Sequence, residues 1–300
     1  MRKPRFTIIT TCHNAVATIE RTICSVLDQG YDDTQYIVID RGSTDETGEI
    51  ISLYENELTW LSERHAPAAS AINAAMELAE GEVVGFVQDL LLPAALTEVS
   101  RRMEGSDRIP WLVGQTVRVN DDDVQVGVNP VAAPASLLPL LMHDSGELPL
   151  TASFFRRELL AEHGPFDPSL PLAFDYEYTC RLHAAGVTPT VIPQQLAAER
   201  EASPTAAATL QRGLELIAAA QRYTRDLPLR QQYLLWRNCD ERLRIHALAE
   251  VELQPQHARN LLWQQLKTRP WWIMDHAIRQ TLMHGVTHPV PAEMARGKAA

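Results

Sequence analysis

The chain has 300 residues, 45% of them hydrophobic, which is enough for one α/β body with an appended unit, and its net charge of −11 argues against nucleic acid as a partner. No apolar run approaches the roughly 18 residues of a membrane-spanning helix, and the apolar stretch near the start is too short for a signal peptide, so we expect a cytoplasmic protein. Four widely separated cysteines predict reduced structural thiols.

The first ninety residues predict a βαβ unit. A strand is expected at residues 6–10, an amphipathic helix at residues 16–27, and a second strand at residues 36–39 that stops on Asp40. Parallel strands joined by a crossover helix end at the same edge of a sheet, where open α/β sheets bind their ligands. Asp40 is therefore expected at a ligand-binding edge.

Strands and helices continue to alternate up to about residue 192. The Asp121-Asp122-Asp123 triplet has the composition of a metal site, but a charged hairpin turn is the favoured interpretation. Residues 130–150 are rich in proline and predict a long loop. The expected elements are a helix capped by Thr44, strands at 58–61, 83–87, 111–119, 150–155 and 187–192, and helices at 72–79, 156–163 and from Asp175 to about 186.

A domain boundary is predicted at Ser203-Pro204, beyond which the pattern is helical only. The charge also changes there. Residues 201–300 carry 13 basic and 9 acidic side chains, whereas residues 1–200 carry 14 and 29. This asymmetry would allow the C-terminal helices to contact an anionic membrane, and an ordinary solvated helical surface is the alternative.

Several short motifs follow one another in a fixed order over the first 195 residues. They are Thr11 to Asn14, Asp40-Arg41-Gly42-Ser43-Thr44-Asp45, Ser62-Glu63, Ala71-Ile72-Asn73, Gly81 to Phe86, Phe154 to Leu159, Gly164 to Asp167, and Asp175-Tyr176-Glu177. In this order the chain resembles the family 2 glycosyltransferases of the GT-A fold. The resemblance implies an α/β fold with a Rossmann-like, mostly parallel sheet flanked by helices, with residues 1–95 as nucleotide-binding half, 96–200 as acceptor half, and 203–300 as a helical appendage.

The resemblance also implies an activity. It implies an inverting glycosyltransferase that moves a sugar from a nucleotide-diphosphate donor, UDP-linked as the first expectation, to a glycan or lipid-linked acceptor, as in cell-surface polysaccharide biosynthesis. Asp40 is then the nucleoside ligand, with Thr11 and Asn14 beside it, and Asp175 is the base for the acceptor hydroxyl. Asp40 as a turn former and Asp175 as a helix cap are the alternatives, and Glu177 is the second candidate for the base.

Two departures from the family pattern concern the donor's diphosphate. Where the family carries an Asp-x-Asp motif for Mg²⁺ or Mn²⁺, this chain keeps Asp89 alone, so metal binding is expected to be weak or dispensable. Upstream, Arg64 and His65 stand near a position that is normally acidic. These two residues either supply cationic charge to the diphosphate or are simply solvated.

Because of these departures, a second function stays open. A catalytically degenerate relative would bind a nucleotide, a glycan or a partner protein without turnover. A nucleotidyltransferase is disfavoured because the loop after the first strand is neither glycine-rich nor basic, and no G-x-G-x-x-G supports a dinucleotide dehydrogenase. The expected location is the cytoplasm, with peripheral contact at the inner face of the membrane as an option.

Overall fold

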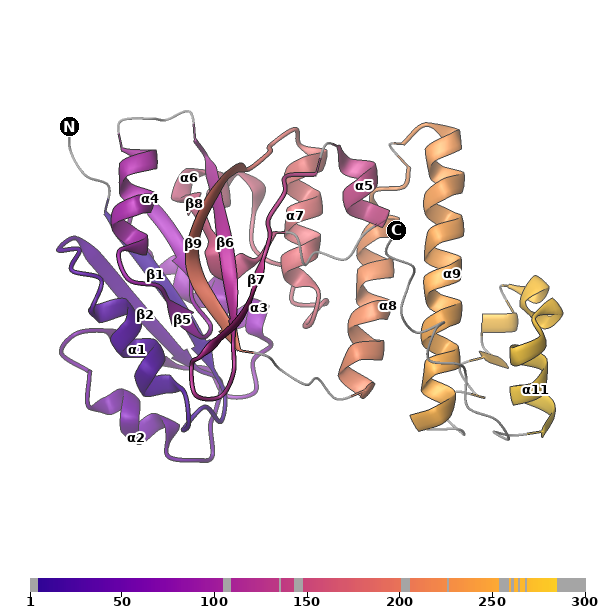
Figure 1. The fold of residues 1–300 in the computed structure, drawn as a ribbon, viewed down its shortest axis with the longest axis horizontal. Coiled ribbons are helices and arrows are strands. Elements are labelled where there is room, and N and C mark those ends of the chain that lie inside the picture. Colours follow the sequence, from indigo (N-terminus) through magenta and orange to yellow (C-terminus); the bar gives the residue numbers. More distant parts are fainter. Residues whose placement is uncertain are drawn as a thin grey trace. The chain divides into compact units, whose positions relative to one another are not determined.

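The fold is taken from a computed structural model that describes residues 5–104, 109–134, 136–142, 148–200, 206–225, 227–253, 259, 262–263, 265–267 and 269–284. The chain divides into two compact units, Met1–Ala202 and Ser203–Ala300 (Figure 1). The predicted boundary residues Ser203 and Pro204 lie outside the described residues. Each unit is described by itself.

Within the described part of the first unit, nine strands form one sheet. Their order is β3-β2-β1-β4-β8-β6-β9-β5, and β7 pairs with β6 (Figure 1). The strands are β1 (Phe6–Cys12), β2 (Thr34–Asp40), β3 (Thr59–Ser62), β4 (Val83–Phe86), β5 (Leu90–Leu91), β6 (Trp111–Val119), β7 (Gln125–Asn129), β8 (Ser153–Arg156) and β9 (Thr190–Arg200).

Strand directions define the edge that matters for function. Strands β1 to β4 are mutually parallel where they pair, so the predicted parallel arrangement holds on this side of the sheet. Beyond β4 the sheet is mixed, because β8 runs antiparallel to both β4 and β6, while β9 runs parallel to β6. It follows that β1, β2, β4, β6 and β9 all end at one side, which we call the carboxyl edge.

Helices cover both faces of the sheet. Alternation along the strands sends Ile8 and Val38 to a core shared with α1, α2 and α4, and sends Ile9 and Ile37 to a core shared with α3, α6 and α7. The helices of this unit are α1 (Ile19–Leu27), α2 (Thr47–Ser52), α3 (Ala68–Glu77), α4 (Ala95–Met103), α5 (Leu137–Met142), the 3₁₀ helix η2 (Leu150–Ala152), α6 (Arg157–His163) and α7 (Phe174–Ala184).

Two predicted helix starts are wrong by a few residues. Helix α1 begins at Ile19, because Val16 is 40% exposed and its backbone N–H binds the Asp45 carboxylate at 3.2 Å. Thr44 does not cap α2, which begins at Thr47, because the Thr44 backbone N–H is bound by a distant side chain instead. In both cases, contacts between distant parts of the chain decide where the helix begins.

The proline-rich loop and the last strand also differ from expectation. Within residues 130–150 the structure contains α5, whose Leu140 and Leu141 are buried and whose carbonyls accept from the Tyr176 hydroxyl at 3.2 Å. The strand predicted at 150–155 begins only after η2. Strand β9 runs past Pro193 to Arg200, because an irregular register against β6 accommodates the proline.

The second unit is helical in its described residues. Asp240 accepts hydrogen bonds from Arg269 Nε at 2.9 Å and from Trp272 Nε1 at 3.1 Å. Among the described residues, no helix combines the length and hydropathy that a membrane span requires. The elements are α8 (Ala206–Arg222), α9 (Leu229–Leu253), the 3₁₀ helix η3 (Pro270–Met274) and α11 (His276–His284).

Candidate functional site

The first part of the site is a hydrogen-bonded cluster where β1 and β2 end. Asp40 is 6% exposed, and its Oδ1 accepts from the Ser43 backbone N–H at 2.9 Å and from the Ser43 hydroxyl at 2.6 Å. Ser43 Oγ in turn accepts from the Asn14 backbone N–H at 2.8 Å, and Asn14 Oδ1 accepts from the Thr44 N–H at 2.8 Å. We call Asn14, Asp40, Ser43 and Thr44 the loop cluster.

The backbone around the loop cluster requires a glycine. Gly42 has φ of +87°, and a Cβ placed there would lie 3.2 Å from Arg64 Cα. On the neighbouring strand, Thr11 is half-buried and pairs with Ile39 in the β1–β2 ladder. Cys12 is opposite Asp40, and burial, with a smaller contribution from the Asp40 charge, raises the pKa of its thiol to about 12. The thiol is therefore protonated at neutral pH.

Arg64 and His65 follow β3 at the same edge. Both are exposed, and the backbone of His65 adopts a φ of +62° and donates its N–H to the Arg41 carbonyl at 3.1 Å. The structure thus brings Thr11, Asn14, Asp40, Arg64 and His65 to one side of the sheet, as a nucleotide site would require.

Asp175 lies in the first turn of α7, inside the helix rather than at its cap. The cap residue is Ala173, which makes no side-chain cap bond, and Asp175 Oδ1 accepts from the Tyr176 N–H at 2.8 Å. Because α7 leads back to the start of β9, its first turn faces the carboxyl edge. The Asp175 carboxylate is half-buried there.

Glu177, the second candidate for the base, has a structural role. It is 3% exposed, and Arg181 donates to it through Nη2 at 2.5 Å and Nε at 3.3 Å. Arg181 Nη1 also donates to the carbonyls of His163 at 3.0 Å and Pro165 at 2.8 Å. This ion pair anchors the segment before α7 and leaves Asp175 as the candidate base.

Asp89, the predicted metal ligand, is part of an ion cluster. Its Oδ2 accepts from the Arg200 backbone N–H at 3.0 Å, and Arg200 Nε lies 3.8 Å from its Oδ1. Arg200 Nη2 contacts Asp123 Oδ1 at 2.8 Å, and Arg21 Nη1 contacts Asp123 Oδ2 at 2.5 Å. We call Arg21, Asp89, Asp123 and Arg200 the ion cluster. The triplet containing Asp123 is the β6–β7 turn, as predicted.

The ion cluster does not fit a divalent ion. Such an ion takes six or more oxygen ligands in proteins. Across the residues that the structure describes, no group of three His, Cys, Asp or Glu side chains is placed to hold a metal. The carboxylates of Asp89 and Asp123 both already accompany guanidinium groups, so the cluster offers a metal a donor set poor in oxygen.

Glu199 is a site residue that the sequence analysis missed. Burial raises the pKa of its carboxyl, with further increases from the negative charges of Asp89 and Asp175, against hydrogen bonds from Thr116 and Asn129. The charges of Asp89 and Asp175 therefore both act on this side chain. Glu199 and Arg200 were missed because the predicted last strand ended at residue 192.

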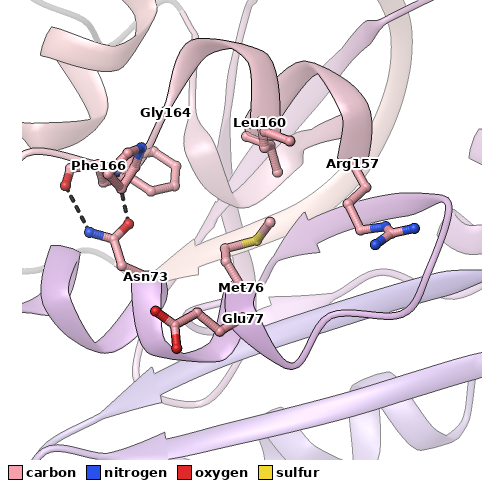
Figure 2. A pocket seen from close by; sticks show the side chains of 9 residues that line it. Asn73, Met76, Glu77, Arg157, Leu160, Gly164 and Phe166 are labelled. Atoms are coloured by element: carbon pink, nitrogen blue, oxygen red, sulfur yellow. Dashed lines mark hydrogen bonds between the residues drawn. The ribbon is translucent and has the colours of Figure 1, made fainter.

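A hollow of about 400 Å³ lies away from this edge, between α3 and α6 (Figure 2). At its rim, the Asn73 amide donates to the Phe166 carbonyl at 2.8 Å and accepts from the Phe166 N–H at 2.9 Å. Asn73 belongs to one of the motifs in the sequence signature, and here it fixes the segment that leads to α7. Its role is thus structural, and the hollow contains none of the predicted site residues.

Comparison with known proteins agrees with this geometry. Residues 7–107 match the model of glycosyl transferase family 2. TuaG of Bacillus subtilis, provisionally named a teichuronic acid biosynthesis glycosyltransferase, is 39% identical over 90 residues, which are 28% of this chain and 35% of TuaG.

Two solved structures share the fold. TarS residues 1–349 of S. aureus superpose with a TM-score of 0.56 at 17% identity, and the match covers 93% of this chain and 89% of that TarS fragment. The mannosyltransferase PcManGT of Pyrobaculum calidifontis, solved with GDP-Man and Mn²⁺, gives a TM-score of 0.56 at 21% identity, with coverage of 94% and 84%. The sheet and its carboxyl edge therefore define a GT-A glycosyltransferase fold. The match to the family model covers residues 7–107, so this part of the chain is similar to the family 2 glycosyltransferases.

Proposed function

We propose that this glycosyltransferase transfers a sugar, with inversion, from a UDP-linked donor to a glycan or lipid-linked acceptor in cell-surface polysaccharide biosynthesis. The observation that carries the proposal is the loop cluster of Asp40 and Asn14 where β1 and β2 end, and Asp175 in the first turn of α7 supports it. A UDP donor is supported by TarS, which has been solved with UDP and with UDP-GlcNAc. The polysaccharide context is supported by the name of TuaG.

In the proposed reaction Asp175 accepts the proton of the acceptor hydroxyl. The hydroxyl oxygen forms a bond to the anomeric carbon, and the bond between that carbon and the diphosphate breaks, with its electron pair leaving on the diphosphate oxygen. Attack from the face opposite the diphosphate inverts the configuration. The loop cluster holds the nucleoside through this step, so that orientation and proton transfer are supplied by separate parts of the edge.

A divalent ion is the least supported part of the predicted site. PcManGT was solved with Mn²⁺, whereas Asp89 here accompanies Arg200. We therefore propose that Mg²⁺ or Mn²⁺ is needed weakly or not at all. The same pairing favours the alternative function, a degenerate relative that binds nucleotide or glycan without turnover.

We also propose that residues 203–300 contact an anionic membrane. Tyr233 stacks on Trp236, and Trp236 lies tilted against Trp271. The three rings are between 43% and 58% exposed, in a unit with an excess of basic residues. The protein should sediment with vesicles of phosphatidylcholine and phosphatidylserine, and it should not sediment with vesicles that lack phosphatidylserine. Equal sedimentation with both, or with neither, would refute membrane contact of this kind.

Nucleotide binding tests the first half of the proposal. A ligand at 100 times its Kd stabilises the native state by about 2.7 kcal/mol, so UDP should raise the melting temperature measurably. Asp40→Ala should remove this shift, whereas Glu80→Ala, a change of the same kind at an exposed position on the opposite edge, should keep it. If UDP, GDP, CDP and dTDP all leave the melting temperature unchanged, with and without Mn²⁺, the nucleotide site is refuted.

Turnover tests the second half. Asp175→Asn removes the base while keeping the shape, so kcat should fall by about 10²- to 10⁴-fold with nucleotide affinity unchanged. Glu177→Gln is the matched control, because it changes the structural carboxylate two residues away. It should lower the melting temperature through the weakened bond to Arg181, with a far smaller effect on kcat. Full activity of Asp175→Asn would refute the assignment, and binding without any turnover in the wild type would favour the degenerate relative.

A further inference from the structure

The ion cluster brings two arginines from distant parts of the sequence to one carboxylate. Arg21 comes from α1 and Arg200 from the last residue of β9, and they contact the two oxygens of Asp123 at 2.5 and 2.8 Å. Guanidinium groups arranged in this way match the geometry of phosphate oxygens as well as that of a carboxylate. The Asp123 carboxylate thus occupies a place that suits an anion.

The directions of the strands determine at which edge of the sheet the ion cluster lies. Strands β4, β6 and β9 end at the same edge as β1 and β2, which carry the loop cluster. Asp89 follows β4, and the Arg200 backbone N–H binds it at 3.0 Å. The Arg200 side chain is held further by the carbonyls of Asn120 and Asp121, at 3.4 and 3.3 Å. A positive group is therefore fixed at the same edge of the sheet as the loop cluster.

From this arrangement we infer that Arg200, with Arg21, binds the diphosphate of the donor, and that their charge replaces a divalent ion. The inference rests on the proposed function and deepens it. Asp123 is then an internal anion that the diphosphate displaces. The Asp123 carboxylate can leave without unfolding the β6–β7 turn, because Asn120 Oδ1 holds the turn through the N–H groups of Asp122 at 3.1 Å and Val124 at 2.9 Å.

The inference also gives Asp89 a role that requires no metal ion. A buried guanidinium without an anionic partner is costly, and the Arg200 side chain is only 14% exposed. Asp89 balances Arg200 from the sheet side, whereas Asp123 contacts it from the turn side. One anion is part of the scaffold, and the other is exchangeable.

The test measures binding of inorganic pyrophosphate, which any nucleotide-diphosphate donor shares, together with UDP and uridine, by calorimetry in excess EDTA. The wild type should bind pyrophosphate and UDP without added metal. Arg200→Gln should weaken both by about 10- to 100-fold, the loss expected for charge-assisted hydrogen bonds, and should leave uridine binding unchanged. Arg5→Gln is the matched control. This substitution removes the same charge as Arg200→Gln, but Arg5 pairs with Asp33 and Glu80 at the opposite edge of the sheet.

Asp123→Asn gives the result of opposite sign. If Asp123 competes with the diphosphate, removing its charge should tighten pyrophosphate binding several-fold, whereas a purely structural Asp123 would leave binding unchanged or weaken it. This variant also decides the matter if Arg200→Gln fails to fold.

Three results would overturn the inference while UDP binding still upheld the proposed function. They are pyrophosphate binding that requires Mn²⁺, normal binding by Arg200→Gln, and binding by Asp123→Asn that is no tighter than that of the wild type. Pyrophosphate binding through Arg200 without binding of any nucleoside diphosphate would instead refute the proposed function and leave the cationic site standing.

Discussion

The loop cluster and the ion cluster lie at the same edge of one sheet, yet they are built differently. In the loop cluster, short polar side chains and backbone N–H groups satisfy one another over at most 30 residues of sequence. In the ion cluster, full charges meet across as many as 111 residues, from Asp89 to Arg200. The loop cluster is a hydrogen-bonded set of mostly neutral groups. The ion cluster consists of charged side chains, one of which, Asp123, is the anion that a diphosphate would displace. One edge can thus recognise the uncharged and the charged part of a ligand by separate physical means.

The largest expected effect breaks the loop cluster through its backbone. Gly42→Ala forces an L-residue into a φ of +87° and places a Cβ 3.2 Å from Arg64 Cα, so the free energy of unfolding should fall by about 1–2 kcal/mol from conformation alone, with a further loss from the contact. Gly30→Ala is the control, because Gly30 has a φ of +63° with no atom within 4 Å of the added Cβ. Urea unfolding should show the larger loss for Gly42→Ala. Equal losses would mean that the Arg64 contact relaxes freely.

A smaller effect separates the two clusters by their response to salt. Ser43→Ala removes the hydroxyl that donates to Asp40 at 2.6 Å and should cost about 1 kcal/mol of unfolding free energy, nearly independent of ionic strength. Arg21→Gln breaks a pair in which Arg21 is 41% exposed, so its cost should be below about 1 kcal/mol and should shrink as salt is added. Urea unfolding at low and high NaCl checks both. The same salt dependence for the two variants would remove the distinction between the clusters.

The smallest effect concerns pH. Burial and the charges of Asp89 and Asp175 raise the pKa of Glu199, so the native state binds more protons than the unfolded state, and stability falls as pH rises from the ordinary Glu pKa through the raised one. Glu199→Gln, which is neutral at every pH, should therefore melt higher than the wild type at pH 8 and equally at pH 4. The gain should stay below about 2–4 °C, the shift that 1 kcal/mol produces in a domain of some 200 residues. A variant less stable than the wild type at pH 8 would show that hydrogen bonding at Glu199 outweighs its charge.

The two clusters also differ in how far the sequence predicted them. The βαβ pattern and the residues after it were enough to place Asp40 and Asn14 together, because local periodicity and strand direction determine that edge. The partners of Asp89 were not predicted, because the expected strand stopped near Pro193, whereas pairing with β6 carries β9 on to Arg200. Likewise, the sequence offered Asp175 as the base and Glu177 as the second candidate, and only the ion pair with Arg181 reveals the structural role of Glu177. Tertiary contacts, which leave no local signal, supplied what was missing.

Cys12 gives the loop cluster a natural reporter. Cys12 is 6% exposed, and its Sγ donates a hydrogen bond to the Ile39 carbonyl at 3.6 Å. Burial raises the pKa of the thiol to about 12. Thiol reagents attack the thiolate, so the closed edge should resist alkylation for long times. Each modification of Cys12 then records an opening of the β1–β2 ladder beside Asp40. The rate of that modification would measure how often this edge of the sheet opens locally. The decrease of the rate on addition of a nucleotide would measure how strongly the bound nucleotide suppresses this opening.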